Sequence, residues 1–310
     1  MKKGLIVFAI SLFISFYGIG QITLFGDTTN VFKSAPTYTP WRAWGVNAFH
    51  AVAYPAAMSG LNNIWYQGYP KTNFFWRNDN SHWMGLDKVG HFTATYRIGQ
   101  ISSNLYSWAG VEFKKAAFIG SIVGFATISS IEIFDGNSSN YGASWGDLGA
   151  NLLGASFLLY QSTWDDPYAI NFKLFTSKSA FIRYNPQQFG GSRPKQIFSD
   201  YNGQTYWLSF GMKKIVPLDV IPDWLNIAVG YGADGLIGQT KNPQFTEDGA
   251  IIPNFDRYRQ YYLSLDIELR KIRTRYPFMN AVLKNVGFIK IPFPTLEFSK
   301  FGVKPYLYYL

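Results

Sequence analysis

Six polar side chains in the first half of this 310-residue chain have types and spacings that could do chemistry. Two pairs are four residues apart, so each would share one face of a helix, and a third pair is three residues apart. The pairs are Asp87 with His91, Asp147 with Asn151, and Glu132 with Asp135. If the helices that carry them pack as a bundle, all six side chains can meet in one place.

Carboxylates beside an imidazole are suited to general acid–base catalysis or to binding a metal ion. In a catalytic interpretation, Glu132 or Asp135 is the base, and His91 and Asp87 are its partners or metal ligands. The chain has only three histidines, which disfavours a His-rich metal site. A carboxylate-rich site with one His stays open, and the sequence identifies no cofactor.

A structural interpretation explains most of the same residues, and we prefer it. Ser144 and Asp147 match a capping box, Asp87 suits the first turn of a helix, and Asn151 can bridge two helices. Glu132 is the hardest to explain in this way, because it ends an apolar stretch where a carboxylate needs a cation. Lys88 is its nearest candidate partner. We therefore predict a structural polar cluster that includes Lys88, Ser144, Asp147 and Asn151, with the catalytic site as the alternative.

The elements that must position these residues are four helices over residues 41–165. Apolar residues at helical spacing predict helices at 42–64, 86–108, 112–134 and 144–160, with a kink or break at Pro55. The aromatic-rich segment 65–83 between the first two helices is predicted to be a loop. Gly120 and Gly124 form a GxxxG step, which predicts close packing of the third helix.

The second part of the chain, 166–310, carries strand signals instead. Short aromatic, alternating segments at 180–184, 205–211, 226–232, 260–268 and 302–309 predict an antiparallel sheet, with one helix at 277–286. Five strands are fewer than the roughly 8 of the smallest outer-membrane barrels. The predicted fold is therefore α+β, a helical bundle followed by a partly open or small barrel-like sheet.

The N-terminal residues predict export. Residues 1–20 combine Lys2 and Lys3, an apolar run from Leu5 to Phe16 and a Gly-Ile-Gly cleavage pattern, which together indicate a signal peptide. Residues 21–40 are predicted to be extended. The chain has no cysteine, which excludes disulfides, thiolate chemistry and lipidation on a cysteine among these residues.

The composition favours contact with a membrane in a Gram-negative-type envelope. Only 15% of the residues are charged while 19% are aromatic, and Tyr and Trp favour the membrane–water boundary. The formal net charge of +9 suits anionic lipid headgroups, and no nucleic-acid motif is present. Membrane lipid or an envelope protein complex is therefore the expected partner, at the outer membrane or the periplasmic face. The sequence does not indicate an oligomeric state.

Three ordered blocks resemble a known family. They read Asp87-Lys-Val-Gly-His91-Phe, Glu132-Ile-Phe-Asp135-Gly and Gly142-Ala-Ser-Trp-Gly-Asp147-Leu-Gly-Ala-Asn151-Leu-Leu-Gly154. Together they are similar to the YfiM-like predicted periplasmic lipoproteins, domain of unknown function family 2279, over roughly residues 85–162. More distantly, their order resembles the VanZ-like membrane family. The resemblance implies an envelope location and a shared polar cluster, but no reaction. The missing cysteine departs from the lipoprotein pattern.

Two functions remain open from the sequence. The preferred one is a non-enzymatic envelope protein, structural or part of a membrane complex. The alternative is a membrane-proximal hydrolase or transferase that acts on an envelope lipid or glycan through the carboxylate and His cluster. Replacing Glu132 separates them, because a structural role predicts lost stability and a catalytic role predicts a stable but inactive protein.

Overall fold

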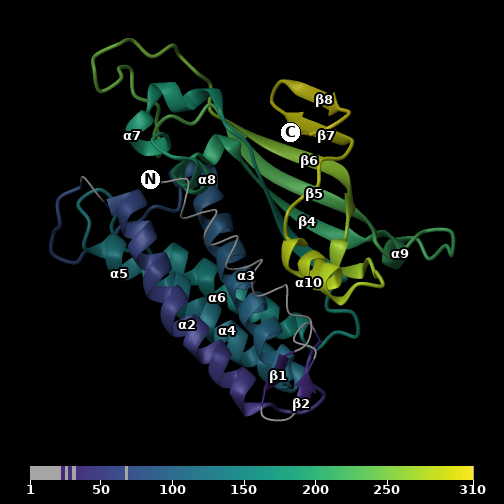
Figure 1. Ribbon diagram of the computed structural model, residues 1–310. Helices are drawn as coiled ribbons and strands as arrows, with labels where there is room; N and C mark the ends of the chain where they lie inside the picture. The colour runs from purple at the N-terminus through teal and green to yellow at the C-terminus, as the bar shows by residue number, and fades with distance from the viewer. Residues whose placement is uncertain (1–21, 25–26, 30–32, 67–68, 310) are drawn as a thin grey trace.

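The computed structural model describes residues 22–24, 27–29, 33–66 and 69–309. The predicted signal peptide lies outside these residues. Within the predicted extended segment, β1 (Ile22–Leu24) and β2 (Asp27–Thr29) pair antiparallel. The long helices then form a helical part up to residue 161, and a six-stranded antiparallel sheet begins at residue 170 (Figure 1). The α+β prediction is confirmed.

The first long helix, α2 (Pro40–Leu61), begins with a proline in its first turn, where a missing N–H is harmless. It continues into a π-helical turn, η1 (Asn62–Tyr66). The predicted break at Pro55 does not occur. Pro55 and Ala51 are both exposed, so water can satisfy the Ala51 carbonyl that loses its helical partner.

The predicted helix at 86–108 is confirmed as α3 (Leu86–Trp108), and the last helix of the bundle is α6 (Trp145–Gln161). The predicted helix at 112–134 is instead two helices, α4 (Phe113–Ser129) and α5 (Ile131–Gly136). Ser130 separates them. Its hydroxyl donates to the Thr127 carbonyl at 2.7 Å, a local bond that competes with a continuous helix.

Helices α3 and α4 touch at their backbones. A Cβ added at Gly120 would lie 2.3 Å from the Gly99 carbonyl oxygen, and one added at Gly124 would lie 2.4 Å from that of Thr95. Both distances are far below van der Waals contact, so only glycine fits. The predicted GxxxG step of Gly120 and Gly124 therefore determines how closely α4, and α5 after it, approach the polar face of α3.

Among the described residues, one helical stretch is long and apolar enough to cross a membrane by length and composition. It is Phe113–Gly136, which comprises α4 and α5, and 39% of it is buried in the protein. Core helices of soluble proteins meet the same criterion, so this stretch alone is weak support for a membrane span.

The six strands of the large sheet are antiparallel neighbours in chain order. They are β3 (Ile170–Thr176), β4 (Gln204–Gly211), β5 (Leu225–Asp234), β6 (Tyr258–Ile267), β7 (Thr295–Ser299) and β8 (Gly302–Tyr306). The sheet is open, with β3 and β8 at its edges. The predicted helix at 277–286 is α10 (Pro277–Val286).

Short helical segments connect these strands, and one of them corrects the sequence prediction. Residues 180–184 were predicted to form a strand but form a 3-10 helix, η3 (Ala180–Tyr184), whose start is capped by the Ser179 hydroxyl. The other short segments are η2 (His82–Gly85), α7 (Pro186–Phe189), α8 (Arg193–Ser199), η4 (Tyr201–Gly203), α9 (Met212–Ile215) and η5 (Leu269–Lys271).

Strands β6 and β7 bury polar side chains and expose apolar ones, although the buried face of the sheet also holds a small apolar core of Trp207, Ala228 and Tyr262. On β6, Ser264 and Asp266 are buried, whereas Tyr261 and Leu263 are 53% and 37% exposed. Strand β7 repeats the pattern, with Thr295 and Glu297 buried between exposed apolar neighbours. This alternation is the reverse of that in a soluble protein, where apolar side chains face inward. The sequence analysis missed strands β3 and β7, although apolar and polar residues alternate along most of both.

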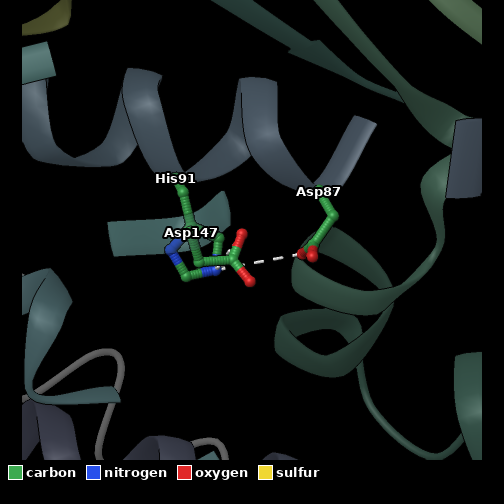
Figure 2. Close-up of side chains that lie close together, drawn as sticks. All are labelled: Asp87, His91 and Asp147. Carbon is green, nitrogen blue, oxygen red and sulfur yellow. Dashed lines mark ion pairs between the residues drawn. The ribbon is translucent and has the colours of Figure 1, made fainter. Parts of the chain in front are cut away.

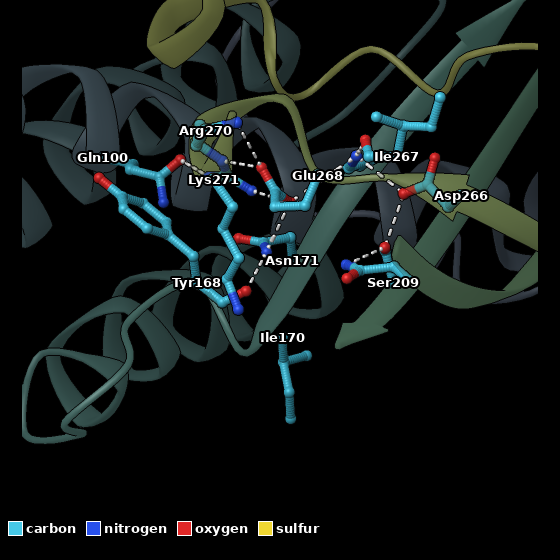
Figure 3. Close-up of polar contacts among 12 residues, drawn as sticks. Gln100, Tyr168, Ile170, Asn171, Ser209, Asp266, Ile267, Glu268, Arg270 and Lys271 are labelled. Carbon is cyan, nitrogen blue, oxygen red and sulfur yellow. Dashed lines mark hydrogen bonds and ion pairs between the residues drawn. The ribbon is translucent and has the colours of Figure 1, made fainter. Parts of the chain in front are cut away.

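A closed ionic network fills the polar side of the sheet (Figure 3). Arg270 binds both carboxylate oxygens of Glu268, at 2.6 and 2.9 Å. Lys173 lies 2.8 Å from Asp266, which also accepts from the Ser209 hydroxyl at 2.6 Å and lies 3.7 Å from Lys290. These side chains are at most 3% exposed. We call the ion pairs of Lys173, Lys290, Asp266, Glu268 and Arg270 the sheet cluster.

Candidate functional site

The N-terminus of α3 is held against the strand-rich part of the chain. Trp83 and Leu86 pack with Phe189 and Leu236 in one buried core. Trp83 and its neighbour Met84 have φ values of 48° and 56°, a left-handed conformation that is rare for such side chains. The Tyr231 hydroxyl donates to the Met84 carbonyl at 2.6 Å. Contacts with the sheet thus fix the turn that aims the first residues of α3.

Lys88, in the first turn of α3, lies among three carboxylates. Its Nζ is 2.6 Å from Asp79, 2.9 Å from Asp147 and 3.2 Å from Asp87. The sequence suggested Lys88 as the partner of Glu132, and the structure corrects that pairing. Burial lowers the pKa of Lys88, but the charges of Asp87 and Asp147 outweigh burial and raise it above its ordinary value. Lys88 is thus a fixed cation.

His91 lies one turn further along α3 and points between Asp87 and Asp147 (Figure 2). Its Nε2 is 3.7 Å from Asp147 Oδ1 and 3.9 Å from Asp87 Oδ1. Its Nδ1 is 3.2 Å from Asn151 Oδ1 and 3.8 Å from Glu132 Oε1. Burial lowers the pKa of His91, yet the surrounding carboxylates, Asp147 above all, raise it overall.

In the predicted capping box, Glu132 and not Asp147 accepts the hydrogen bond from the Ser144 N–H. The Ser144 hydroxyl accepts from the Asp147 N–H at 3.2 Å, which confirms half of that box. The Ser144 N–H, however, donates to Glu132 Oε2 at 2.7 Å and not to Asp147. Glu132 therefore ties α5 to the start of α6, and the Asp147 side chain remains free to face Lys88 and His91.

Burial holds protons on the carboxyl groups of this site. It raises the pKa of Glu132 and of Asp135 to about 8, and that of Asp147 to about 7. Asp79 differs, because hydrogen bonds from Lys88 and Ser144 outweigh its burial and lower its pKa. Carboxyl groups tuned toward neutral pH in one place are typical of functional sites.

Asn151 and Asp135 belong to two separate sets of hydrogen bonds at this site. Asn151 accepts from the Thr95 hydroxyl at 3.1 Å and donates to Ser129 at 3.3 Å, so it bridges α3, α4 and α6. Asp135 does not join the Lys88 network through a hydrogen bond among the described residues. It accepts a 2.7 Å bond from the Tyr66 hydroxyl at the end of η1.

Sequence reasoning missed three residues of the site: Tyr66, Asp79 and Tyr201. Asp79 lies in the loop before α3, and its Oδ1 also accepts from the Ser144 hydroxyl at 2.5 Å. Tyr201 comes from the strand-rich part and donates to Asp87 at 2.8 Å. A loop position and a residue more than a hundred positions away carry no periodic signal. We call Asp79, Asp87, Lys88, His91, Glu132 and Asp147 the helix cluster.

A small cavity of about 80 Å³ opens onto the helix cluster. Asp79, Asp87, His91 and Asp147 line it from the helical part, and Tyr201 is among the residues that line it from the strand-rich part. Such a volume accommodates a few water molecules or an ion with its water ligands. The chain thus provides a polar pocket with acid, base and cation beside one another, at the junction of its helices and its sheet.

The fold and site define an α+β protein whose helical part carries a carboxylate and His pocket. Residues 75–163 match a family model described as "Predicted periplasmic lipoprotein (DUF2279)", which confirms the family resemblance. The match includes every member of the helix cluster and ends before β3. It supports a periplasmic, cell-envelope location and names no activity. Neither a curated protein nor a solved structure matches the chain.

Proposed function

We propose that this protein is a non-enzymatic, membrane-attached component of the cell envelope, exported by a signal peptide and attached to the outer membrane. The observation that carries this proposal is the reversed sheet. An apolar face exposed to water is unfavourable, whereas the same face in contact with lipid is stable. Strands that place polar residues inside and apolar residues outside are typical of proteins in outer membranes.

The exposed face is continuous across four strands. Val229, Leu263 and Leu296 are direct cross-strand neighbours on β5, β6 and β7, and each is at least 37% exposed. A second row joins Tyr261 to Phe298 and then to Val303 on β8. We call these six residues the apolar sheet face. Its width and lack of charge suit a hydrocarbon surface.

Basic residues flank the apolar sheet face. A groove of about 450 Å³ meets one end of this face, where Tyr261 and Phe298 line it together with Arg257, Arg259 and Lys300. Lys300 extends over the Phe301 ring, with its Nζ 4.9 Å from the ring centroid. Long basic side chains that cover aromatic rings are favoured at membrane interfaces. We therefore expect anionic phospholipid as the occupant, rather than a second copy of this chain.

The test is flotation of the purified protein with vesicles. We expect binding to vesicles that contain phosphatidylglycerol and weaker binding to pure phosphatidylcholine. Leu263→Glu combined with Phe298→Glu should reduce binding about tenfold or more, since burying one such side chain contributes about 1.5–3 kcal/mol. Ile251→Glu, in an exposed loop, is the matched control. Undiminished binding by the double variant, or its conversion of a dimer to a monomer, would contradict the proposal.

Fractionation of cells tests the location. Recovery in the outer membrane after an alkaline wash is expected. Recovery in the inner membrane would instead favour the helical stretch Phe113–Gly136 as the anchor. Release as a soluble periplasmic protein would contradict membrane attachment altogether.

A second candidate function is supported by the pocket. The shifted pKa values of Glu132 and Asp147 beside His91 suit a hydrolase or transferase that acts on an envelope lipid or glycan. In this case Glu132→Gln should accumulate at the normal level, retain membrane binding and fail to restore a deletion strain. A fully functional Glu132→Gln protein would rule out Glu132 as a catalytic base.

A further inference from the structure

We infer that Asp87, His91 and Asp147 bind a divalent first-row metal ion, such as Zn²⁺ or Mn²⁺, and leave one coordination position open to the cavity. One ligand atom from each residue lies within 4.8 Å of the other two. This inference does not depend on membrane attachment. It deepens the second candidate function, because it names the cofactor that the pocket would use.

The hydrogen bonds of Asn151 fix which nitrogen of His91 is available. Asn151 Nδ2 donates to Ser129, and Asn151 Oδ1 accepts from Thr95, so this oxygen is the group that faces His91. An oxygen at 3.2 Å requires His91 Nδ1 to carry the hydrogen. A metal ion would displace the proton from His91 Nε2 and take its lone pair, in the space between this nitrogen and the carboxyl groups of Asp87 and Asp147.

The distances in the site fit a metal ion better than direct hydrogen bonds. His91 Nε2 lies 3.7 and 3.9 Å from the nearest carboxylate oxygens of Asp147 and Asp87. Both distances are too long for a hydrogen bond. Two ligands of one Zn²⁺ ion, each at about 2.0–2.2 Å, are commonly separated by about 3.3–4 Å. The two distances from His91 Nε2 therefore match those between ligands that share one ion.

Glu132 supplies a second, independent observation. It is 97% buried, since only 3% of it is exposed, and its Oε1 has no hydrogen-bond partner among the described residues. This oxygen points at His91 Nδ1 from 3.8 Å. A carboxylate behind a metal-binding His typically orients the ring and strengthens its bond to the metal. Glu132 and Asn151 together would perform this task.

Lys88 is the internal competitor for the ion. Its ammonium lies 2.9 Å from Asp147 Oδ1, the same oxygen that faces His91. A bound ion would replace Lys88 at Asp147, while Lys88 keeps its 2.6 Å contact with Asp79. Removal of Lys88 should therefore strengthen metal binding. A site in which Lys88 is the only cation predicts the opposite, a loss of structure without any gain in metal affinity.

The chemistry follows from an open position on the ion. A metal held by three protein ligands can bind a water molecule and lower its pKa toward neutrality. The open position would face the cavity that Tyr201 lines. A substrate of the second candidate function would bind in this cavity. The oxygen and nitrogen ligand set favours Zn²⁺ or Mn²⁺ over soft ions such as Cu⁺.

Titration calorimetry with ZnCl₂ or MnCl₂ and the EDTA-treated, purified protein tests the site. We expect one ion per chain, at least tenfold weaker binding for Asp147→Asn and His91→Asn, and tighter binding for Lys88→Met. Glu132→Gln should weaken binding about 10- to 100-fold, as second-layer substitutions do. Asp248→Asn, in an exposed loop, is the control. No binding by either the wild type or Lys88→Met, or equal binding by Asp147→Asn, would overturn the inference.

X-ray absorption of the wild-type protein with bound Zn²⁺ gives an answer even if a variant fails to fold. One imidazole nitrogen with oxygen ligands is the expected first shell. Two or more imidazoles would overturn the inference, because the proposed site contains only His91. Neither readout measures turnover, so metal binding without any activity would leave this site intact and refute only the second candidate function.

Discussion

The two ionic clusters of this protein differ in balance and in access. In the sheet cluster, the two carboxylates of Asp266 and Glu268 face three cations, Lys173, Lys290 and Arg270, and all five side chains are buried. In the helix cluster, four carboxyl groups surround one lysine and one histidine. A cavity opens onto the second cluster. The carboxylates of the sheet cluster are therefore already outnumbered by cations, whereas the helix cluster has capacity for another cation.

This difference separates a structural role from a binding role. A buried network whose members satisfy one another fixes the packing around it and offers nothing to a ligand. A surplus of carboxylates beside a cavity instead keeps protons, or attracts a metal ion, because the charges cannot all be satisfied by the protein. Burial of polar groups alone does not distinguish a structural cluster from a binding site. The balance of charge and the access to solvent distinguish them.

The largest expected effect is in the sheet cluster. Glu268→Gln leaves the buried Arg270 guanidinium without its carboxylate and should lower the free energy of unfolding by about 3–5 kcal/mol. Urea unfolding measures this loss. Glu268→Gln combined with Arg270→Gln should lose less than the sum of the two single variants. Strict additivity would show that Glu268 and Arg270 do not stabilise each other, and would contradict the structural role given to the sheet cluster.

A smaller effect is expected where the helices hold the pocket together. Gly124→Ala should lower the free energy of unfolding by about 1–3 kcal/mol, because the new methyl group overlaps the Thr95 carbonyl. Gly149→Ala is the matched control, since nothing lies within 4 Å of a Cβ there. Thermal unfolding of both variants provides the measurement. Equal melting temperatures would mean that α3 and α4 can separate without cost.

Glu132 distinguishes hydrogen bonding from charge in the helix cluster. Glu132→Leu should lower stability by about 1–3 kcal/mol, because the buried Ser144 N–H loses its acceptor. Glu132→Gln retains an acceptor oxygen and should lose less than half as much. Chemical unfolding near pH 6, where the native carboxyl group is protonated, compares the two variants. A larger loss for Gln than for Leu would contradict this role.

The last effect concerns pH and Asp135. Burial raises its pKa from 3.8 to about 8, so the folded protein holds this proton more tightly than the unfolded chain. Its contribution to stability is full below about pH 4 and is lost as the pH rises toward 8. Asp135→Asn should therefore flatten the decline in unfolding free energy between pH 5 and 8. Unfolding curves recorded in EDTA test this slope, and an unchanged slope would contradict the assignment.

Much of the helical part was predictable, because apolar residues recur there at the spacing of an α-helix. Apolar spacing placed α3 and α6 within a residue or two, and the spacing of Asp87 with His91 and Asp147 with Asn151 brought those four side chains together as expected. The split between α4 and α5 was not predictable from the apolar pattern, since it depends on a local bond of Ser130.

The strand-rich part was harder to predict, because its strands are short and bury polar as well as apolar side chains. Lys173 on β3 and Glu297 on β7 are both buried, and Phe172 on β3 packs against Phe92 and Phe157 of the helices. Long-range partners were also invisible. The bond from Tyr201 to Asp87 joins residues 114 positions apart, and only the folded chain brings them together.

The most direct test of the difference between the clusters is one set of unfolding measurements with and without Zn²⁺. The proteins are the wild type, Asp147→Asn and Glu268→Gln, each in EDTA and at a Zn²⁺ concentration about 100 times the dissociation constant. With Zn²⁺ at about 100 times the wild-type dissociation constant, we predict that the unfolding free energy of the wild type and Glu268→Gln rises by about 2.7 kcal/mol each, and that of Asp147→Asn by about 1.4 kcal/mol or less. Equal stabilisation of all three proteins, or of none, would contradict the assignment of a cation site to the helix cluster.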